Sequence, residues 1–298
     1  MNIAGAADES VMDLELKTEY WSDLDARAAF KSFMRTIHGL DFSLWESAGC
    51  WDDAYTPFSF FQGDKIVASV CIYLLDSVID GRQTRLAQVS GVGTLPQWRR
   101  RGLSRQLTEI GLAWAQDRHD GIFLFADTDA IPYYERTGFS PIEEYVVIAR
   151  LAPTTRRTGA VKLDPGRAGD LEKIRGYATR RAPISNTFSV LNEKLVMFHV
   201  LYTLRNCVYE VPDLDCLVFF ERKNRCVRLF DIVGERTPPL AELYPYITDA
   251  HDSIAELHFQ TDQLGLDETE TRVLPGNNPF VRGAFPVAMP VFPYTSRA

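Results

Sequence analysis

Three consecutive arginines stand directly before a glycine in the segment PQWRRRGLSRQL, residues 96–107. Apolar residues then recur at helical spacing from Leu103 to Trp114, which predicts an amphipathic helix of about five turns. The start of a helix leaves backbone N–H groups unpaired and carries a partial positive charge, so it favours an anion, phosphate above all. Gly102 would let the backbone approach such a ligand, and the arginines would add full charges around it.

Spacing alone leaves two interpretations of this segment open. In one, amides and guanidinium groups hold a diphosphate at the exit of a strand. In the other, the arginines surround a solvated helix cap and lie over the neighbouring sheet. The chain has a formal net charge of -8, so the positive charge is local. A general nucleic-acid binder would be expected to be basic overall, and we therefore predict no nucleic-acid partner.

The elements around this segment predict an α/β fold. A continuous apolar strand, GIFLFAD, follows the helix, and strand, helix and buried strand in this order make a parallel, right-handed crossover. Gly63-Asp64 and Asp80-Gly81 are hairpin signals. The first half is expected to contain a strand at 12–20, helices at 22–37 and 41–49, three strands within 56–96, a helix from 103, a strand at 121–127, a short helix within 130–139 and a closing strand at 143–151.

The second half repeats this order of elements. Residues 152–160 are polar and unpatterned, which is typical of a linker. Beyond them we expect a strand and a helix within 161–177, a helix at 187–204, a meander of strands within 206–235, a helix at 240–247 and a strand at 254–261. The sequence therefore predicts two domains, at 1–151 and 161–298.

Two short motifs resemble the signatures of the GNAT superfamily of N-acetyltransferases. Arg99-Arg-Arg-Gly102-Leu-Ser104 matches the (Arg/Gln)-x-x-Gly-x-(Gly/Ala) signature, which follows a strand in that family. Tyr134, followed by Gly138-Phe139, matches a second signature about 30 residues further on. The resemblance implies a mixed, mostly antiparallel sheet with a central splayed parallel pair and flanking helices. Because the second half repeats the element order, we expect this fold twice.

The resemblance also implies acetyl-CoA as a co-substrate. The backbone amides from Arg100 to Arg105 would hold its pyrophosphate, and the preceding strand end would pair with the pantetheine arm and offer an N–H to the thioester oxygen. The expected cofactor-binding residues are Val92, Gly93, Thr94, Arg99, Arg100, Arg101, Gly102, Leu103, Ser104, Arg105 and Asp127.

The chain departs from the family pattern at three positions. Ser104 replaces a smaller Gly or Ala. Asp127 stands where many members carry an Asn that contacts the cofactor arm. Gln88 stands where some members carry a glutamate as general base, so no base is identified.

Deprotonating a lysine-like amine at neutral pH costs roughly 4 kcal/mol. Three ways to supply this cost stay open: a side chain near the first helices, a water chain, or an acceptor such as an arylamine that needs no base. The side chains considered are His38, Asp41, Glu46, Asp52 and Asp53.

Tyr134 is the expected catalytic residue. A phenol is a weaker acid than a thiol, so full proton transfer to the departing thiolate would be uphill by roughly 2 kcal/mol. The expected role is therefore a hydrogen bond to sulfur that strengthens as charge develops. The second half lacks both signatures, and we interpret it as a degenerate copy that completes a substrate cleft or an interface.

These observations predict an N-acetyltransferase that acts on a primary amine by direct attack in a ternary complex. The alternatives are a catalytically silent acetyl-CoA-binding regulator and an acyltransferase with a different acyl donor. The expected partner is a small-molecule or peptide amine, with a homodimer as an open possibility. Five scattered cysteines without a CxxC pair, and dispersed histidines, predict reduced thiols, no metal site and a cytoplasmic protein. No segment predicts a signal peptide or a membrane span.

Overall fold

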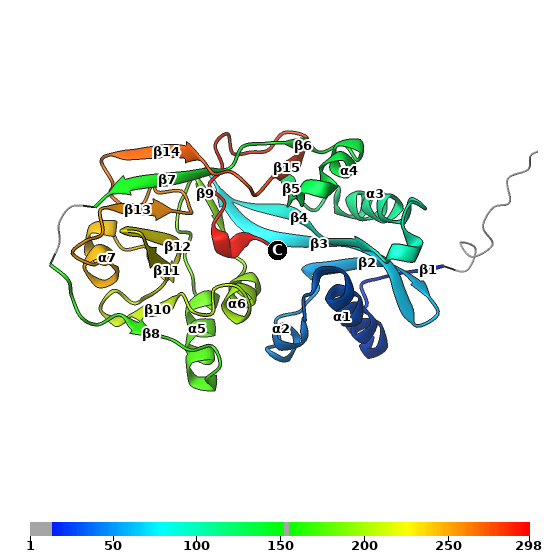
Figure 1. The fold of residues 1–298 in the computed structure, drawn as a ribbon, viewed down its shortest axis with the longest axis horizontal. Helices are drawn as coiled ribbons and strands as arrows, with labels where there is room; N and C mark the ends of the chain where they lie inside the picture. The colour runs from blue at the N-terminus through cyan, green and yellow to red at the C-terminus, as the bar shows by residue number, and fades with distance from the viewer. Residues whose placement is uncertain (1–13, 152–154) are drawn as a thin grey trace, which may run out of the picture. The chain divides into compact units, whose positions relative to one another are not determined.

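The computed structural model describes residues 14–151 and 155–298 (Figure 1). Contacts divide the chain into two compact units. Among the described residues, one unit holds 14–73 together with Val89–Arg118, and the other holds Leu74–Gln88 and the described residues from His119 onward. Two long strands, β3 (Lys65–Ile79) and β4 (Arg82–Thr94), pass from one unit into the other.

The first unit begins with a strand, two helices and a hairpin. Antiparallel pairing joins β1 to β2 and β2 to β3. Asp23 caps the first helix by accepting a hydrogen bond from the Ala26 N–H, and Gly39 ends it in the left-handed conformation. Hairpin turns lie at both predicted places. The bounds are β1 Glu15–Thr18, α1 Leu24–His38, α2 Ser43–Ser47 and β2 Tyr55–Gln62.

Helix α3 (Leu103–Ala115) follows β4 after a short 3-10 turn at Pro96–Trp98. It has 13 residues, so the expected five turns were too many. Its buried face also differs from the expected stripe, because Trp114 is only half-buried while Gly111 is buried. A Cβ at Gly111 would lie 3.2 Å from Cγ1 of Ile72. Because Gly111 has no side chain, α3 packs on the sheet through the face that contains Gly111, and Trp114 lies at the edge of that face.

The second unit contains the parallel crossover strand. Leu86–Gln88 of β4 pair in parallel with Gly121–Phe123 of β5. The next neighbour of β5 comes from far along the chain: β15 pairs antiparallel with both β5 and β6. The bounds are β5 Gly121–Phe125, a 3-10 turn Thr128–Ala130, α4 Ile131–Arg136, β6 Ser140–Pro141 and β15 Pro279–Arg282.

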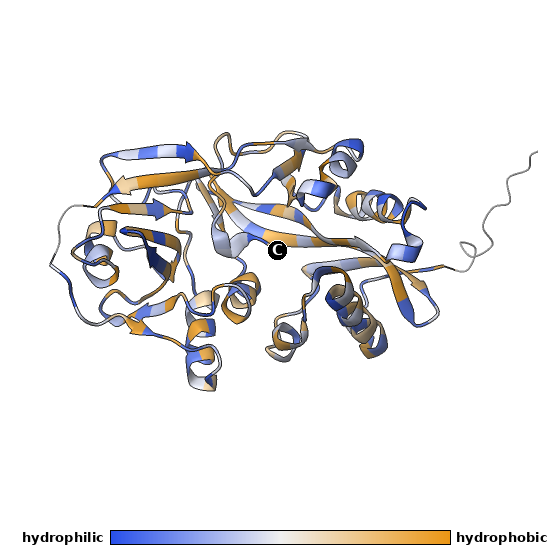
Figure 2. Cartoon of the chain, viewed as in Figure 1, coloured by the Kyte–Doolittle hydropathy of each residue, from blue (hydrophilic) through white to orange (hydrophobic). Residues whose placement is uncertain are grey.

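Strand β7 (Tyr145–Arg150) does not close the first half as expected. It pairs instead with β13 (Ile254–Leu257) and β14 (Thr269–Val273) in a second sheet. The preceding β6 ends at Pro141, which has no N–H with which to extend a hairpin ladder. Figure 2 shows β7 largely hydrophobic and β14 largely hydrophilic, and β14 is exposed along its whole length.

The second sheet has the order β14-β7-β13-β12-β11-β10-β8. Its strands pair antiparallel except β12 and β13, which run parallel. The remaining bounds are β8 Val161–Lys162, α5 Ala168–Thr179, β9 Phe188–Val190, α6 Glu193–Leu201, β10 Val208–Val211, a 3-10 turn Pro212–Leu214, β11 Cys216–Lys223, β12 Cys226–Gly234, α7 Leu240–Ile247 and a 3-10 turn Tyr294–Ser296.

The helix expected at 187–204 was wrong over its first turn. Strand β9 occupies that stretch and pairs with Ser77–Ile79 of β3. The Asn192 side chain accepts a hydrogen bond from the Leu195 N–H, which caps α6 at this point. A good N-cap residue thus starts the helix later than the apolar pattern suggested.

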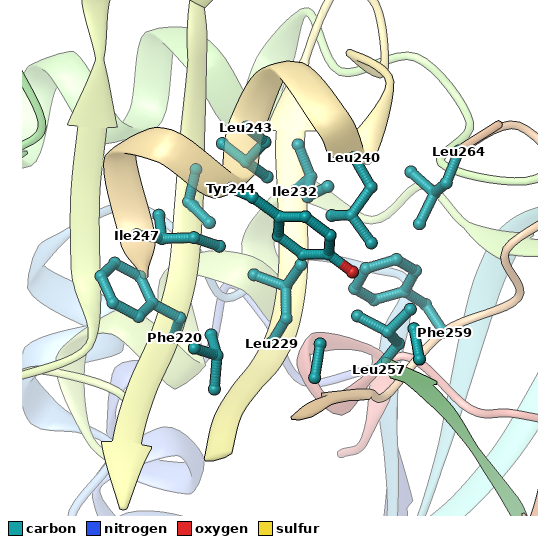
Figure 3. Packing of buried hydrophobic residues seen from close by; sticks show 14 of the residues in the cluster. Phe220, Leu229, Ile232, Leu240, Leu243, Tyr244, Ile247, Leu257, Phe259 and Leu264 are labelled. Atoms are coloured by element: carbon teal, nitrogen blue, oxygen red, sulfur yellow. The ribbon is translucent and has the colours of Figure 1, made fainter. Parts of the chain in front are cut away.

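Helix α7 covers one face of the second sheet. Leu240, Leu243 and Ile247 of this helix belong to the same buried cluster as Leu229 and Ile232 of β12 (Figure 3). Such burial contributes roughly 1.5–3 kcal/mol for each large apolar side chain. The cluster gives the second sheet a core of its own.

The predicted fold class is confirmed. The structure has two mixed sheets, mostly antiparallel, each with one parallel pair and flanking helices. The domain boundary at 151–161 stays a prediction. Among the described residues, no helix is long and apolar enough to cross a membrane.

Candidate active site

The carboxyl end of β4 is shaped by two glycines. Gly91 has a φ of +58°, which breaks the extended backbone and is typical of a bulge. At Gly93 a Cβ would lie 2.7 Å from Cγ2 of Ile37 and 3.2 Å from Cζ of Phe33. Helix α1 therefore packs directly on the backbone at this position, and only glycine fits. The backbone of Val92–Thr94 is thereby fixed against α1.

A hydroxyl pair joins the end of β4 to the first turn of α3. The hydroxyl oxygens of Thr94 and Ser104 lie 2.6 Å apart. Ser104 is one of the residues that depart from the GNAT signature, and here its hydroxyl ties the helix to the strand. The Arg99 guanidinium adds a second tie by donating to the Thr94 carbonyl oxygen at 3.2 Å.

The four arginines of this segment have different surroundings. Arg101 lies 4.7 Å from the ring centre of the buried Trp98, and Arg105 pairs with Glu109 at 2.9 Å. Arg100 is exposed with a φ of +64°, and no hydrogen bond or ion pair engages its side chain within the described parts of the chain. Its guanidinium is thus available to an anion, whereas Arg99, Arg101 and Arg105 also stabilise the protein.

Gly102 is the N-cap of α3, with a φ of +79°. No side chain caps this helix, and a Cβ at Gly102 would meet nothing within 4 Å. The first N–H groups of a helix have no intrahelical partner, so here they lie beside open space and next to Arg100. This arrangement suits a phosphate or diphosphate.

Asp127 and Tyr134 lie in the second unit. Asp127 is exposed and begins the 3-10 turn after β5. Tyr134 is a buried residue of α4, with its ring centre 5.1 Å from that of Tyr133 and 6.1 Å from that of Phe139. The backbone of Tyr134 accepts hydrogen bonds from the N–H groups of Thr137 and Phe139. The GF pair of the second motif thus closes the helix that carries the tyrosine.

The surroundings of Tyr134 keep its phenol protonated. Burial raises its pKa, and the neighbouring Tyr133 and Asp127 raise it further. A phenol with a raised pKa is an even weaker acid than the sequence suggested. The side chain can donate a hydrogen bond, but it cannot readily lose its proton.

Gln88 is fully buried and engaged by the last residue of the chain shown here. Its side-chain nitrogen donates to the Ala298 carbonyl oxygen at 3.1 Å, and its side-chain oxygen accepts from the Ala298 N–H at 3.0 Å. Both atoms of the amide are therefore used in a structural contact. This is consistent with the expectation that Gln88 is not a base.

A buried polar network holds the segment that reaches Gln88. Arg297 pairs with the buried Glu144. The His199 Nε2–H donates to the Arg297 carbonyl oxygen at 2.7 Å. Thr295 donates to Asp231, which pairs with Arg181 at 3.1 Å. This network could not be predicted from sequence patterns, because the partners in nearly every contact are more than 60 residues apart.

Two of the considered bases are held by cations. Asp41 pairs with Arg35 at 2.8 Å and accepts from the Ser43 N–H, and hydrogen bonds from Ser43 and Arg35 lower its pKa to about 2. Glu46 pairs with Arg27 at 2.7 Å and also with Lys31. The lowered pKa makes Asp41 a weak acceptor for an amine proton, and both oxygens of Glu46 are engaged by cations.

Comparison with known families agrees with this geometry. Residues 51–142 match the model of the acetyltransferase (GNAT) domain family. This part of the chain is a GNAT acetyltransferase domain. The resemblance predicted from the two motifs is confirmed, and both motifs fall within the matched residues.

Solved structures extend the likeness in fold to most of the chain. Eis1 from Mycobacterium abscessus has 18% sequence identity and a TM-score of 0.53, covering 90% of this chain and 73% of that one. GCN5-related N-acetyltransferases from Kribbella flavida and Anabaena variabilis have 15% and 12% identity, TM-scores of 0.52 and 0.53, and cover 91% and 90% of this chain and 72% of each of theirs. A search of curated proteins found no match.

Proposed function

We propose that this GNAT domain transfers the acetyl group of acetyl-CoA to a primary amine by direct attack in a ternary complex. The observation that carries the proposal is the N-terminus of α3, where Gly102 leaves open space beside uncapped amides and Arg100 has no partner among the described residues. A pyrophosphate fits this donor set, because it offers oxygens to several N–H groups and to a guanidinium at once.

The residues of β4 and α3 bind and orient the co-substrate in this proposal. The amides from Arg100 to Arg105 hold the pyrophosphate. The end of β4 extends along the pantetheine arm, and Gly93 lets α1 support that backbone from behind. Asp127 would contact the uncharged part of the co-substrate, as the family resemblance implies. When bound, acetyl-CoA supplies the thioester.

Tyr134 donates a hydrogen bond to the departing sulfur. Because its pKa is raised, the phenol stays protonated throughout the working pH range and stabilises the developing charge without full proton transfer. Such stabilisation by a positioned donor typically contributes tenfold to a thousandfold or more in rate.

The amine proton has no assigned acceptor. Gln88, Asp41 and Glu46 are each engaged elsewhere, so we propose that the proton leaves through His38, Asp52 or Asp53, through a water chain, or from an acceptor amine that is already neutral. The same observations favour the second candidate, a silent acetyl-CoA-binding regulator, which needs no base.

One assay separates the two candidates. The full chain is incubated with acetyl-CoA and a panel of aliphatic amines, arylamines and peptides, and the released thiol is titrated. We expect thiol release that depends on one amine class, and a Tyr134→Phe variant should lower kcat by about tenfold to a thousandfold with little change in cofactor affinity. Tyr133→Phe is the matched control and should keep wild-type kcat.

Binding of acetyl-CoA without any amine-dependent thiol would favour the regulator. Unchanged kcat in Tyr134→Phe, with chemistry shown to be rate-limiting, would remove this tyrosine from the mechanism.

A further inference from the structure

A pocket of about 680 Å³ lies in the second unit, where residues 156–160 cross α7 and the end of β11. Its lining comes from three segments far apart in the sequence. They are residues 156–160, residues 206–222 and the end of α7 at 246–248. The pocket has the size of a small-molecule site, since these typically measure about 300–1,000 Å³.

Aromatic side chains form part of this lining. The rings of Tyr209 and Phe220 lie 4.5 Å apart and are tilted by 38°. Tyr246 contributes a third ring, and its hydroxyl donates to Asp213 at 2.7 Å. Phe220 and Tyr246 are buried, whereas Tyr209 is half-buried. The lining thus includes three aromatic rings, of which that of Tyr209 is the most exposed to a ligand.

The chain segment over the pocket is held in place. The Arg157 N–H donates to the Pro245 carbonyl oxygen at 2.7 Å. Gly159 has a φ of +129°, and a Cβ there would lie 3.4 Å from the Tyr246 ring. Glycine is therefore required where the backbone passes the ring. The expected linker is an ordered wall of the pocket at these residues.

Positive charge surrounds the aromatic surface. Arg156, Arg157 and Arg222 line the pocket, and Lys162 lies 6.0 Å from the ring centre of Tyr209. Arg157 lies 5.9 Å from the ring centre of Tyr246.

Three of the nearby carboxylates have other hydrogen-bond or ion-pair partners, and Glu242 also lies near Arg157. Asp213 accepts from Tyr246, Glu221 pairs with Arg228 at 2.8 Å, and Asp249 pairs with Arg222 at 3.3 Å. No salt bridge engages Arg156, Arg157 or Lys162 within residues 14–151 and 155–298. The Arg157 guanidinium is hydrogen-bonded to the Tyr246 hydroxyl, and all three side chains are free of a competing salt bridge within those residues.

We propose that this pocket binds a small anion that carries a flat aromatic ring, of the class of a nucleoside monophosphate. The arginines that line the pocket suit the dianionic phosphate, and the tyrosine rings suit the base. The site is independent of the proposed acetyl transfer, because neither Asp127, Tyr134 nor any residue of the cofactor segment at 92–105 lines the pocket.

Calorimetry with AMP on the full chain tests this proposal. Because acetyl-CoA also contains an adenine nucleotide, the titration is repeated in Gly102→Asp, which places a carboxylate at the cofactor segment. We expect AMP to bind both proteins equally. Arg156→Ala and Arg157→Ala should each weaken AMP binding by about tenfold, without changing acetyl transfer.

Arg82→Ala is the matched control, since Arg82 is an exposed arginine of the same unit outside the pocket. The affinity of this variant for AMP should equal that of the wild-type protein. Three results would overturn the proposal. The first is the absence of AMP binding at millimolar concentration. The second is AMP binding that is lost in Gly102→Asp but retained in Arg156→Ala and Arg157→Ala. The third is binding of inorganic phosphate as tight as that of AMP.

Discussion

The segments that follow β4 and β12 occupy equivalent places in their sheets but differ in chemistry. Each strand belongs to the parallel pair of its sheet, and each is followed by a turn and a helix. After β4 the chain reads LPQWRRRG before α3, and after β12 it reads ERTPP before α7.

The two helix starts differ in the N–H groups they offer. Pro238 and Pro239 precede α7 and have no N–H to donate. The next amide, that of Leu240, already donates to the Leu264 carbonyl oxygen at 3.0 Å. Gly102 instead leaves the start of α3 open. The sheet geometry alone therefore does not make an anion site, which also needs free donors and a residue without a side chain.

The largest effect should come from closing the open helix start. Gly102→Asp places a side chain and a negative charge where a phosphate would bind, so we expect acetyl-CoA affinity to fall by more than about a hundredfold. The left-handed backbone at this position should cost about 1–2 kcal/mol of stability. Calorimetry and thermal unfolding measure the two effects.

Gly265→Asp is the matched control for backbone strain. Gly265 is also exposed, with a φ of +65° and open space around its Cβ position, so this variant should lose similar stability and keep acetyl-CoA binding. Wild-type affinity in a folded Gly102→Asp protein would contradict the phosphate assignment.

The second unit should be the acid-sensitive one. Burial lowers the pKa of His199 to about 4, so between pH 6.5 and 4 the unfolded chain binds a proton that the folded chain does not. The unfolding free energy should therefore decrease as the pH is lowered through this window. The decrease should be about 1.4 kcal/mol per pH unit and about 3 kcal/mol in all. Denaturant titrations from pH 7 to pH 4 measure this slope.

His199→Gln keeps a donor for the Arg297 carbonyl oxygen and removes the titrating ring. The slope should become shallower in this variant, although burial also lowers the pKa of His258. An identical slope in both proteins would show that folding does not shift the pKa of His199.

Arg100 and Arg236 sharpen the comparison of the two turns. Arg100→Ala should weaken acetyl-CoA binding by about 1–3 kcal/mol, as for loss of one charge-assisted hydrogen bond. Arg236, the one arginine of the ERTPP turn, should be replaceable by alanine without effect. Calorimetry at two ionic strengths should show the Arg100 effect shrinking as salt rises, and equal effects of the two variants would contradict the assignment.

The smallest effect should come from Ser104→Ala. The change removes the hydrogen bond to Thr94, which should cost about 1 kcal/mol of stability. Acetyl-CoA affinity should change by less than about threefold, because the backbone amide stays in place. Thermal unfolding and calorimetry on one sample separate the two, and a large loss of affinity would mean that the hydroxyl contacts the ligand.

Local patterns carried most of the prediction. The RRRG and Tyr-Gly-Phe motifs identified the family through their resemblance to its signatures. Such motifs can be read from sequence because glycine and proline determine the backbone conformation of the few residues around them. Helix α1 and the hairpin after β2 were likewise predicted from a cap residue and a turn pair. The assignment of Tyr134 and the cofactor residues stays a prediction.

Long-range pairing could not be predicted. Nothing in the local pattern of β7 says which sheet it joins, since a half-buried strand fits either. The contact of Gln88 with Ala298 joins residues 210 positions apart, and the buried partners of Arg297 are similarly remote. The predicted start of the helix at 187–204 was wrong because a short apolar strand and the first turn of an apolar helix have similar hydrophobicity.

The insertion of β15 beside β5 has a consequence for the order in which the chain folds. Phe125 and Pro279 are partners in this pairing, so during synthesis β5 remains an open strand edge until residues 279–282 have emerged. Exposed edges pair readily with other chains, and β-pairing over such a sequence distance is slow to form. A fragment that stops at residue 151 would keep this edge permanently, and we expect it to aggregate on expression while the full chain does not.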